Sequence, residues 1–366
     1  MKHTISTLGS HSALDVCEGA KMEGYGTLVV AQKGREKTYL GPYKSRVRET
    51  GGRKREVGVV DELLLLGSFK DMTKKENLDF LKKRNSIFVP NRSFAVYVGY
   101  DSIEKSFPVP VFGNKFLLRA EERDAPKNQY HLMDKAGIRS PRKFPSPEKI
   151  DRLAIVKVSE AKRTYERAFF LARSYEEYRE RSEEMVKSGK ITRESLAKAT
   201  IEEYIVGAHF NLNFFYSPVH GELELLGLDT RRQTNIDGYL RMPADAQLEL
   251  LKLQQPSTIE VGHIACTLRE SLLEQVFELG ERFVHAVESE YKDGLIGPFA
   301  LQGAIVEEGK EEFVCFDVSM RMPGSPGTRF TPYSGYLHRE SVSFGRRIAM
   351  EIKDAEREKM LDKITT

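Results

Sequence analysis

The chain has 366 residues, 40% of them hydrophobic and 30% charged, which allows two or three globular domains with sizeable cores. Its 57 basic and 54 acidic residues nearly balance, which excludes a nucleic-acid-binding surface spread over the whole protein. No apolar run approaches the roughly 18 residues that span a membrane, and no signal-peptide pattern opens the sequence. We therefore expect a soluble, cytoplasmic protein with neither nucleic acid nor membrane as a partner.

The three cysteines are far apart in the sequence and form no CxxC pair: they are Cys17, Cys266 and Cys315. Each lies in an apolar stretch. Buried free thiols in a reducing compartment are therefore the default prediction.

The first 31 residues predict the start of an α/β domain with a parallel sheet. A β-like run at residues 4–8 is followed by a helical run at 13–22 and a second strand at 27–31. The turn after the first strand contains Gly9, Ser10, His11 and Ser12. Such a turn is where open α/β sheets bind anions, although the simpler interpretation is that Ser10 or Ser12 caps the helix.

Residues 33–56 are basic and interrupted by glycines. They predict a solvated hairpin or flexible arm, and a phosphate-attracting flap is the alternative. Further strands are predicted at residues 61–66, 86–90 and 109–113. The polar turn at residues 91–93 follows the second of these strands, and a helical stretch begins at residue 115 and continues to 136, with a domain boundary near residue 120.

The middle of the chain begins with a proline-rich connector at residues 141–147. Residues 154–157 predict a buried strand that ends in Lys157. A second strand is predicted at 168–172, and polar surface helices are predicted at 174–188 and 192–198.

Residues 201–238 predict two antiparallel strands around a glycine-containing turn. The strands are expected at 210–216 and 222–228, after an alternating run at 202–206. A polar cluster at 229–233 closes the second strand. It indicates either a sheet with a ligand-facing polar mouth or a strand end that is simply solvated.

The last third of the chain predicts a strand near residues 258–261, a long amphipathic helix, and a pair of strands followed by a loop rich in Gly, Pro and Ser. These elements are expected at 269–288, at 296–305 with 312–320, and at 321–329, and the last helices at 341–364. Phosphate-loop, nucleophile-elbow and zinc-protease motifs do not occur in the sequence.

Several strand positions carry side chains suited to a nucleoside triphosphate: Lys157, Glu202, Glu203, Gln302 and Asp317. A triphosphate requires a cation beside its phosphates, a backbone edge for adenine, and oxygen ligands for Mg²⁺. Each residue also has a plain alternative, because a strand lysine can extend along the surface and a strand Asp or Gln can face solvent. Position alone leaves the two interpretations open.

Many short segments in one order give the chain a family resemblance, among them TLGSHSAL (7–14), VPNRSF (89–94), AIVK (154–157), IEEYIVG (201–207), ELELLGLD (222–229) and GPFALQ (297–302). Through them the chain resembles the archaeal FAICAR synthetases (the PurP family). These are ATP-grasp ligases that use formate and ATP to formylate the purine precursor AICAR, the ribonucleotide of 5-aminoimidazole-4-carboxamide. The resemblance covers nearly the whole chain.

The resemblance implies an ATP-grasp fold of α/β and α+β class with an N-terminal Rossmann-like domain. The expected division is a substrate-binding domain at 1–120, a small lobe at 121–205 and a large lobe with the metal site at 206–366. It also implies ATP with Mg²⁺ or Mn²⁺, AICAR and formate as substrates, a role in IMP biosynthesis, and a homo-oligomer, either trimer or hexamer.

The resemblance also assigns roles to individual residues. The substrate-binding residues are His11, Ser93 and His263. The ATP-binding residues are Lys157, Glu202, Glu203, Tyr204, Val206 and Gln233. The metal ligands are Gln302 and Asp317. Beyond what the resemblance assigns, we take Arg269 and Arg329 as candidate catalytic cations that would neutralise formate or developing charge.

The sequence departs from the family in the loop after Lys157. The family has a glycine-rich loop there, whereas residues 159–169 contain no glycine. Close approach of backbone to phosphate generally requires glycine. Lys162, Arg163 and Arg167 would supply charge in place of N–H groups, although two glutamates in the same loop oppose this.

Further departures replace family residues at site positions by Gln233, His263, Asp317, Arg329 and Ala120. Asp317 is the mildest of them, because it keeps the charge of glutamate on a shorter side chain. Together with the altered loop, these changes leave a second interpretation open: a related protein with altered or lost catalysis that binds a nucleotide or a partner subunit.

Overall fold

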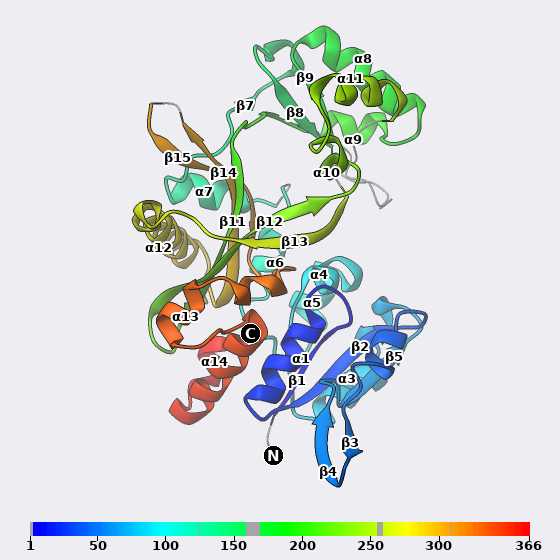
Figure 1. Cartoon of the computed structure of the whole chain (residues 1–366), viewed down its shortest axis with the longest axis vertical. Helices are drawn as coiled ribbons and strands as arrows, with labels where there is room; N and C mark the ends of the chain where they lie inside the picture. Colours follow the sequence, from blue (N-terminus) through cyan, green and yellow to red (C-terminus); the bar gives the residue numbers. More distant parts are fainter. Residues whose placement is uncertain (1–2, 124, 159–168, 255–258, 308) are drawn as a thin grey trace.

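The computed structural model describes residues 3–123, 125–158, 169–254, 259–307 and 309–366. The described chain contains three sheets of four, four and five strands and a separate two-stranded hairpin. In Figure 1 the N-terminal sheet lies at the lower right, the second sheet at the top, and the five-stranded sheet between them.

The N-terminal sheet is parallel, with strand order β5-β2-β1-β6. Its strands are β1 (Thr4–Leu8), β2 (Gly26–Gln32), β5 (Glu62–Leu66) and β6 (Ser86–Val89). Side chains along each strand point alternately to the two faces of the sheet. Ile5 packs on the face covered by α1 (Ala13–Met22), whereas Leu8 packs on the other face, in an apolar cluster with the helices that follow β5. Those helices are η1 (Phe69–Thr73), α3 (Lys75–Lys83), α4 (Arg92–Val98) and α5 (Tyr100–Ser106).

Helix α14 (Phe344–Glu358) crosses α1 at close range because each helix has a glycine at the crossing. A Cβ atom on Gly19 would lie 2.1 Å from the backbone nitrogen of Arg346, and one on Gly345 would lie 2.0 Å from the carbonyl oxygen of Asp15. Any larger residue at either position would push the helices apart. A helix from the last part of the chain therefore packs on the N-terminal domain.

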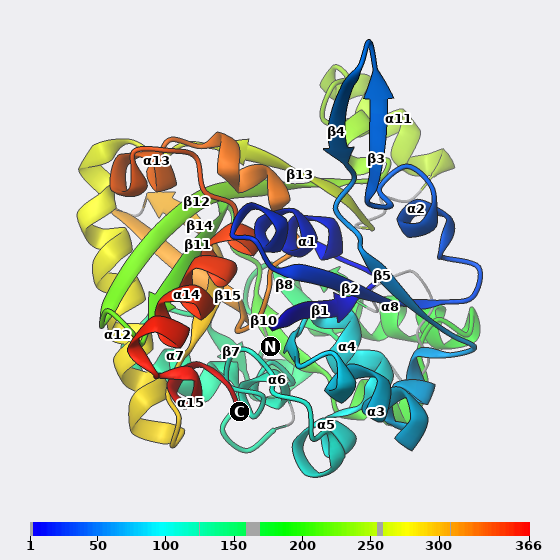
Figure 2. The ribbon, with the colours of Figure 1, turned by 90° about the horizontal axis from the view of Figure 1, so that it is seen from below.

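The basic segment forms a hairpin of β3 (Arg46–Thr50) and β4 (Arg53–Val57), preceded by α2 (Lys37–Leu40). Its residues are mostly exposed, and Figure 2 shows it projecting from the body of the protein. This confirms the predicted solvated hairpin.

The small lobe is an antiparallel sheet with strand order β7-β10-β8-β9. Its strands are β7 (Lys143–Phe144), β8 (Ala154–Lys157), β9 (Phe169–Ala172) and β10 (Thr200–Glu203). Val156, Phe170 and Ile201 form its core with side chains of α8 (Tyr175–Lys187) and α9 (Arg193–Ala197). A short 3₁₀ turn, η2 (Pro147–Lys149), precedes β8.

The large sheet is antiparallel, with strand order β13-β12-β11-β14-β15. Its strands are β11 (Ala208–Ser217), β12 (Glu222–Gln233), β13 (Glu260–Cys266), β14 (Gly297–Glu307) and β15 (Glu311–Ser319). Leu212, Leu228 and Leu301 bury one face against Phe283 of α12 (Leu273–Glu290), next to α7 (Gln129–Lys135). The remaining elements are α6 (Leu117–Ala120), α10 (Ile236–Tyr239), α11 (Ala244–Leu253), η3 (Glu270–Leu272), η4 (Pro326–Phe330), α13 (Tyr333–His338) and α15 (Leu361–Ile364).

Two predicted elements differ from the structure. Residues 109–113 form no strand, since Val111 and Phe112 make only isolated bridges to Phe88 and Thr365. The helical stretch at 115–136 is divided into α6 and α7, because Asn128 accepts hydrogen bonds from two backbone N–H groups and so starts a new helix. The polar cluster at 229–233, expected to close the second strand, forms the last part of β12.

The cysteines are free, as predicted. Cys17 and Cys315 are buried, and Cys266 is partly exposed. Among the described residues, the helices are all too short or too polar to cross a membrane.

Candidate functional site

A row of polar side chains crosses the large sheet on the face opposite α12. The strand register places Asp229, Asn211, Gln302 and Asp317 side by side on β12, β11, β14 and β15. Asp229 is 1% exposed, and it accepts hydrogen bonds from Asn211 Nδ2 at 2.8 Å and from Asn213 Nδ2 at 2.6 Å. A buried carboxylate with two amide donors has a fixed position, so it provides a rigid base for the groups around it.

The expected metal ligands Gln302 and Asp317 are cross-strand partners in this row. The Gln302 amide donates to Ser319 Oγ at 2.9 Å, and its Oε1 accepts a hydrogen bond from Arg231. Among the described residues there is no group of three His, Cys, Asp or Glu side chains that could enclose a metal ion. An amide and a carboxylate oxygen nevertheless fit Mg²⁺, which is often held by one or two protein carboxylates together with substrate phosphates.

Lys157 reaches from the small lobe onto the large sheet. Its Nζ lies 2.5 Å from Glu202 Oε2 and donates to the carbonyl oxygen of Phe316, 3.5 Å away, next to Asp317. Glu202 is fully buried and also accepts a hydrogen bond from the Tyr130 hydroxyl. The small-lobe lysine thus lies beside the expected metal ligands, at the meeting point of the two sheets.

A second cation, Arg123, lies near the same carboxylates. Burial disfavours its charge, but the charges of Asp317, Tyr130 and Glu202 outweigh burial and raise the pKa of Arg123. The guanidinium therefore stays charged beside Asp317 and Glu202.

Residues 203–206 connect the small lobe to the large sheet. The backbone N–H groups of Glu203 and Tyr204 donate to Arg142 and Leu153, each at 2.9 Å. The Glu203 carboxylate lies 3.3 Å from Arg152 Nη1. Tyr204 is 37% exposed and Val206 is 77% exposed, so this connection presents accessible side chains of the kind that cover a flat aromatic base.

The turn between β1 and α1 meets the N-terminus of α4 and the loop after β15. Ser10 Oγ lies 2.6 Å from Ser93 Oγ, and Ser12 Oγ donates to the Pro323 carbonyl oxygen at 2.6 Å. Ser12 occupies the cap position of α1 in a left-handed conformation, without a side-chain hydrogen bond to the helix. The prediction that Ser10 or Ser12 caps α1 is therefore wrong, because both hydroxyls bind other segments of the chain.

His11 is exposed in the same turn, and its ring faces Gly324 of the loop after β15. It lies within electrostatic reach of Arg321, Glu260 and His263. His11, Ser93 and His263, three residues expected to bind substrate, thus flank one junction between the N-terminal domain and the large sheet.

His263 on β13 lies between two carboxylates. Its Nδ1 contacts Asp229 Oδ2, and its Nε2 is 2.7 Å from Glu260 Oε1. Burial alone would lower the pKa of His263, but the hydrogen bonds with Asp229 and Glu260 raise it to about 9. The ring is therefore an imidazolium at neutral pH.

Sequence reasoning did not single out Arg321, which follows β15. Its side chain is 12% exposed, and its Nε lies 3.4 Å from Glu121 Oε1. Glu121 also contacts Arg92 at 3.3 Å and accepts a hydrogen bond from the Met320 backbone at 2.8 Å, so one carboxylate serves two guanidinium groups. Burial lowers the pKa of Arg321, which shows that its charge is incompletely compensated.

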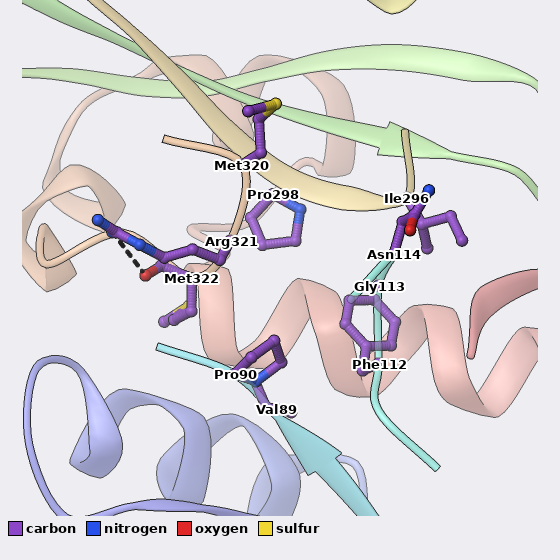
Figure 3. A pocket seen from close by; sticks show the side chains of 10 residues that line it. All are labelled: Val89, Pro90, Phe112, Gly113, Asn114, Ile296, Pro298, Met320, Arg321 and Met322. Atoms are coloured by element: carbon purple, nitrogen blue, oxygen red, sulfur yellow. Dashed lines mark hydrogen bonds between the residues drawn. The ribbon is translucent and has the colours of Figure 1, made fainter. Parts of the chain in front are cut away.

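The backbone beside Arg321 borders a small apolar cavity of about 10 Å³, lined by Val89, Phe112, Ile296 and Met322 among others (Figure 3). A cavity of this size holds at most about one water molecule, so it is no substrate site. The guanidinium of Arg321 points away from Phe112 and donates to the Met322 carbonyl oxygen at 3.2 Å.

The structure does not bring two expected site residues to the polar row. Arg269 is exposed and pairs with Glu311, which lies six residues before Asp317 along β15, or about 20 Å. Arg329 pairs with Glu18 of α1 and lies over the Phe330 ring. Both arginines have partners of their own on the protein surface.

Two more expectations concern the edges of the site. Gln233 ends β12, where its backbone donates to Asp237 Oδ2 at 2.9 Å. The glycine-free loop after Lys157 falls at 159–168, outside the described residues, except for Phe169 at the start of β9.

A small antiparallel lobe above a large antiparallel sheet, with a lysine and a polar row between them, defines an ATP-grasp protein. The fold is shared with N5-carboxyaminoimidazole ribonucleotide synthetase solved as an ADP complex, with a TM-score of 0.58 and 12% identity over 93% of this chain and 78% of that one. The IMP biosynthesis protein PurP from Thermococcus kodakaraensis matches with a TM-score of 0.73 and 29% identity, over 99% of this chain and 100% of that one.

Curated relatives identify the family. The 5-formaminoimidazole-4-carboxamide-1-(beta)-D-ribofuranosyl 5'-monophosphate synthetase of Methanocaldococcus jannaschii is 41% identical over 99% of this chain and 94% of its own length. The synthetase of the same name from Methanopyrus kandleri is 40% identical over 99% and 95%. Two family descriptions also match, a protein of unknown function (DUF1246) at residues 5–144 and a domain of unknown function (DUF1297) at 177–366. The chain belongs to the FAICAR synthetase family of ATP-grasp ligases.

Proposed function

We propose that this protein joins formate to the 5-amino group of AICAR at the expense of ATP, producing FAICAR, ADP and phosphate for IMP biosynthesis in the cytoplasm. The observation that carries the proposal is the position of Lys157, which extends from the small lobe to β15 beside Gln302 and Asp317. This arrangement offers one cation and two oxygen ligands to a triphosphate. Identity near 40% to the named synthetases over the full chain favours this activity over a non-catalytic nucleotide-binding role.

In the first step, a formate oxygen attacks the γ-phosphorus of ATP, the bond to the β-phosphate oxygen breaks, and formyl phosphate and ADP result. Lys157 would exchange its partner Glu202 for the phosphates, and Arg123 would neutralise charge on the same side. Tyr204 and Val206 would cover the adenine, with the backbone of 202–206 as its polar edge. Gln233 would lie toward the ribose.

Gln302 and Asp317 would hold Mg²⁺ or Mn²⁺ at the phosphates, with Ser319 supporting the Gln302 amide. A divalent cation bound there supplies charge neutralisation for the transferring phosphoryl group. For Gln302 Oε1 to serve as a ligand, Arg231 has to release it.

In the second step, the 5-amino nitrogen of AICAR attacks the formyl carbon, the carbon–oxygen bond to phosphate breaks, and the proton lost by the nitrogen ends on the released phosphate. Arg321 is suited to the anion in this step because it is buried and the Glu121 carboxylate that it contacts is shared with Arg92. Ser93 and His11 would receive the phosphoribosyl end of AICAR, with His263 beside them at the same junction. Orientation and charge neutralisation would provide most of the rate acceleration.

The test is turnover by the purified protein with ATP, Mg²⁺, formate and AICAR. We expect FAICAR and ADP in equal amounts, and transfer of ¹⁸O from labelled formate to phosphate, which reports formyl phosphate. ATP binding without any FAICAR would instead support the non-catalytic alternative. Light scattering coupled to gel filtration would test the expected trimer or hexamer.

A further inference from the structure

His263 has a carboxylate at each ring nitrogen. Nδ1 faces Asp229, and Nε2 lies 2.7 Å from Glu260 Oε1. A neutral imidazole has one N–H donor and one acceptor nitrogen, so it can donate to only one of two carboxylates. Ser325 Oγ also lies 3.2 Å from Nδ1. With both carboxylates ionised, an imidazolium is the form of the ring whose two N–H groups satisfy both of them.

The two carboxylates differ in their exposure to solvent. Asp229 is fixed by the amides of Asn211 and Asn213. Glu260, at the start of edge strand β13, is 25% exposed. His263 consequently connects a partly exposed carboxylate to a buried one that is fixed by two amides.

Glu260 in turn holds the side chain of Arg231 in place. Glu260 Oε2 lies 2.9 Å from Arg231 Nε, and the Arg231 guanidinium donates to Gln302. A continuous chain of polar contacts thus runs from Asp229 through His263 and Glu260 to Arg231. It links the junction beside His11 to the residues expected to hold the metal.

The charges of this chain balance only when His263 is protonated. Two carboxylates then face one imidazolium and one guanidinium. Loss of the proton leaves one negative charge in excess at the mouth of the site, where the phosphate dianion of a ribonucleotide would bind. Other titratable or charged groups in electrostatic reach are His11 from the β1–α1 turn, Arg321 from the loop after β15, and His209 on β11, which interacts with Arg231. The thiol of Cys266 on β13 also senses the charge of Asp229.

We propose that His263 is a positioning residue that, as an imidazolium, fixes Glu260 and through it Arg231 at the ribonucleotide end of the site, and so makes AICAR binding depend on the protonation of one ring. The inference rests on the proposed function, since it names AICAR as the ligand. The role is one of positioning because both ring nitrogens are already occupied by carboxylates.

The experiment is calorimetric titration of the full-length protein with AICAR from pH 6.5 to 10, for the native protein and for His263→Gln. Glutamine can still bond to one carboxylate but carries no charge. The native protein is expected to lose affinity for AICAR as pH rises through the titration of the ring, by about tenfold. His263→Gln is expected to bind about tenfold more weakly at pH 7 and to show little further change with pH.

His220→Gln is a matched control, because His220 is an exposed histidine that pairs with Asp354 far from the polar row. It is expected to keep the native pH profile. An identical pH profile in native protein and His263→Gln would overturn the inference. Failure of the native protein to bind AICAR at any pH would instead count against the proposed function.

Proton NMR of the native protein gives a second readout that does not depend on ligand. An imidazolium held by two carboxylates should show two downfield N–H resonances at pH 7.5 that disappear in His263→Gln. A single N–H resonance at that pH would overturn the inference even if the variant binds AICAR poorly.

Discussion

Strand β12 carries a charged cluster at each end, and the clusters differ in their access to solvent. At its start, Glu224 pairs with Arg347 of α14 at 2.7 Å, and Arg347 pairs with Glu351 at 2.9 Å, with side chains 4% exposed or less. Ser217 completes this cluster by donating to Glu351 at 2.8 Å.

Toward the other end of β12, Asp229 and Arg231 join His263 and Glu260, and three of these four side chains are 12–25% exposed. The first cluster fastens helix α14 to the sheet and offers no surface to a ligand. The second contains the same kinds of groups but retains access on one side, so its members can exchange partners with a substrate. The comparison teaches that accessibility, and not charge content, separates the anchoring end of the strand from the end proposed to meet substrate, which we call the functional end.

The largest expected effect is at the functional end of the sheet. Asp317→Asn removes the one carboxylate of the expected metal pair, and we expect kcat for FAICAR formation to fall by at least about a thousandfold. The thermal midpoint should stay within about 2 °C, because Asp317 is not part of the core. Full retained activity would remove Asp317 from the mechanism.

At the anchoring end of β12 we expect the opposite result, a loss of stability with little change in activity. Glu224→Gln leaves the buried Arg347 with one charged partner fewer, and we expect a loss of about 3–5 kcal/mol in the free energy of unfolding in urea. Turnover of the folded protein at low temperature should change less than twofold. Glu358→Gln, at an exposed pair with Arg357, serves as the control and should cost about 0.5 kcal/mol or less.

The free energy of unfolding should also depend on pH through the titration of His263. Its folded-state pKa is raised to about 9, above the ordinary value of 6.5, so its stabilising contribution is complete below pH 6.5 and is lost as pH rises through 9. The loss should be at most about 3 kcal/mol. Urea unfolding between pH 6.5 and 10 should show this slope in the native protein, and a flatter one in His263→Gln.

Asp15 of α1 is a buried carboxyl group that differs from those in both clusters of β12. Among the described residues, it has no cationic partner in direct contact. Burial raises the pKa of Asp15 to about 6. The folded state then binds a proton more tightly than the unfolded state, so stability falls as pH rises from about 4 through 6. Asp15→Asn should remove this slope and raise stability at pH 7.5 by up to about 3 kcal/mol; an unchanged slope would contradict the assignment.

The smallest effect is expected outside both clusters. Arg269→Gln removes an exposed pair with Glu311, and we expect less than about 0.5 kcal/mol in stability and less than a twofold change in kcat. A large loss of kcat, with formate KM raised, would show that Arg269 reaches the substrate in the working enzyme.

The strands of the fold were largely predictable because their apolar alternation is strong. The runs at 4–8, 154–157 and 210–216 lie within β1, β8 and β11. The failures have local causes. Residues 109–113 have strand-like composition, but they pair through single bridges beside the edge strand β6, and such pairing leaves no periodic signal.

The site was less predictable than the fold. Sequence reasoning placed Lys157, Gln302 and Asp317 on strands, but it could not show that Arg231 and Arg321 lie near them. Side-chain direction along a strand depends on register, and the large sheet has irregularities after Arg232 and after Gln302. Each irregularity shifts the alternation, so residue spacing alone does not tell which side chains share a face.

The crossing of α1 and α14 has a consequence for synthesis of the protein. Gly19 and Gly345 allow two helices more than 300 residues apart in sequence to touch at their backbones. While the ribosome has made only the first third of the chain, the face of α1 that includes Val16 and Ala20 has no α14 to cover it. We therefore expect the first domain to be among the last to mature, and chaperones that bind apolar surface to meet it during that interval.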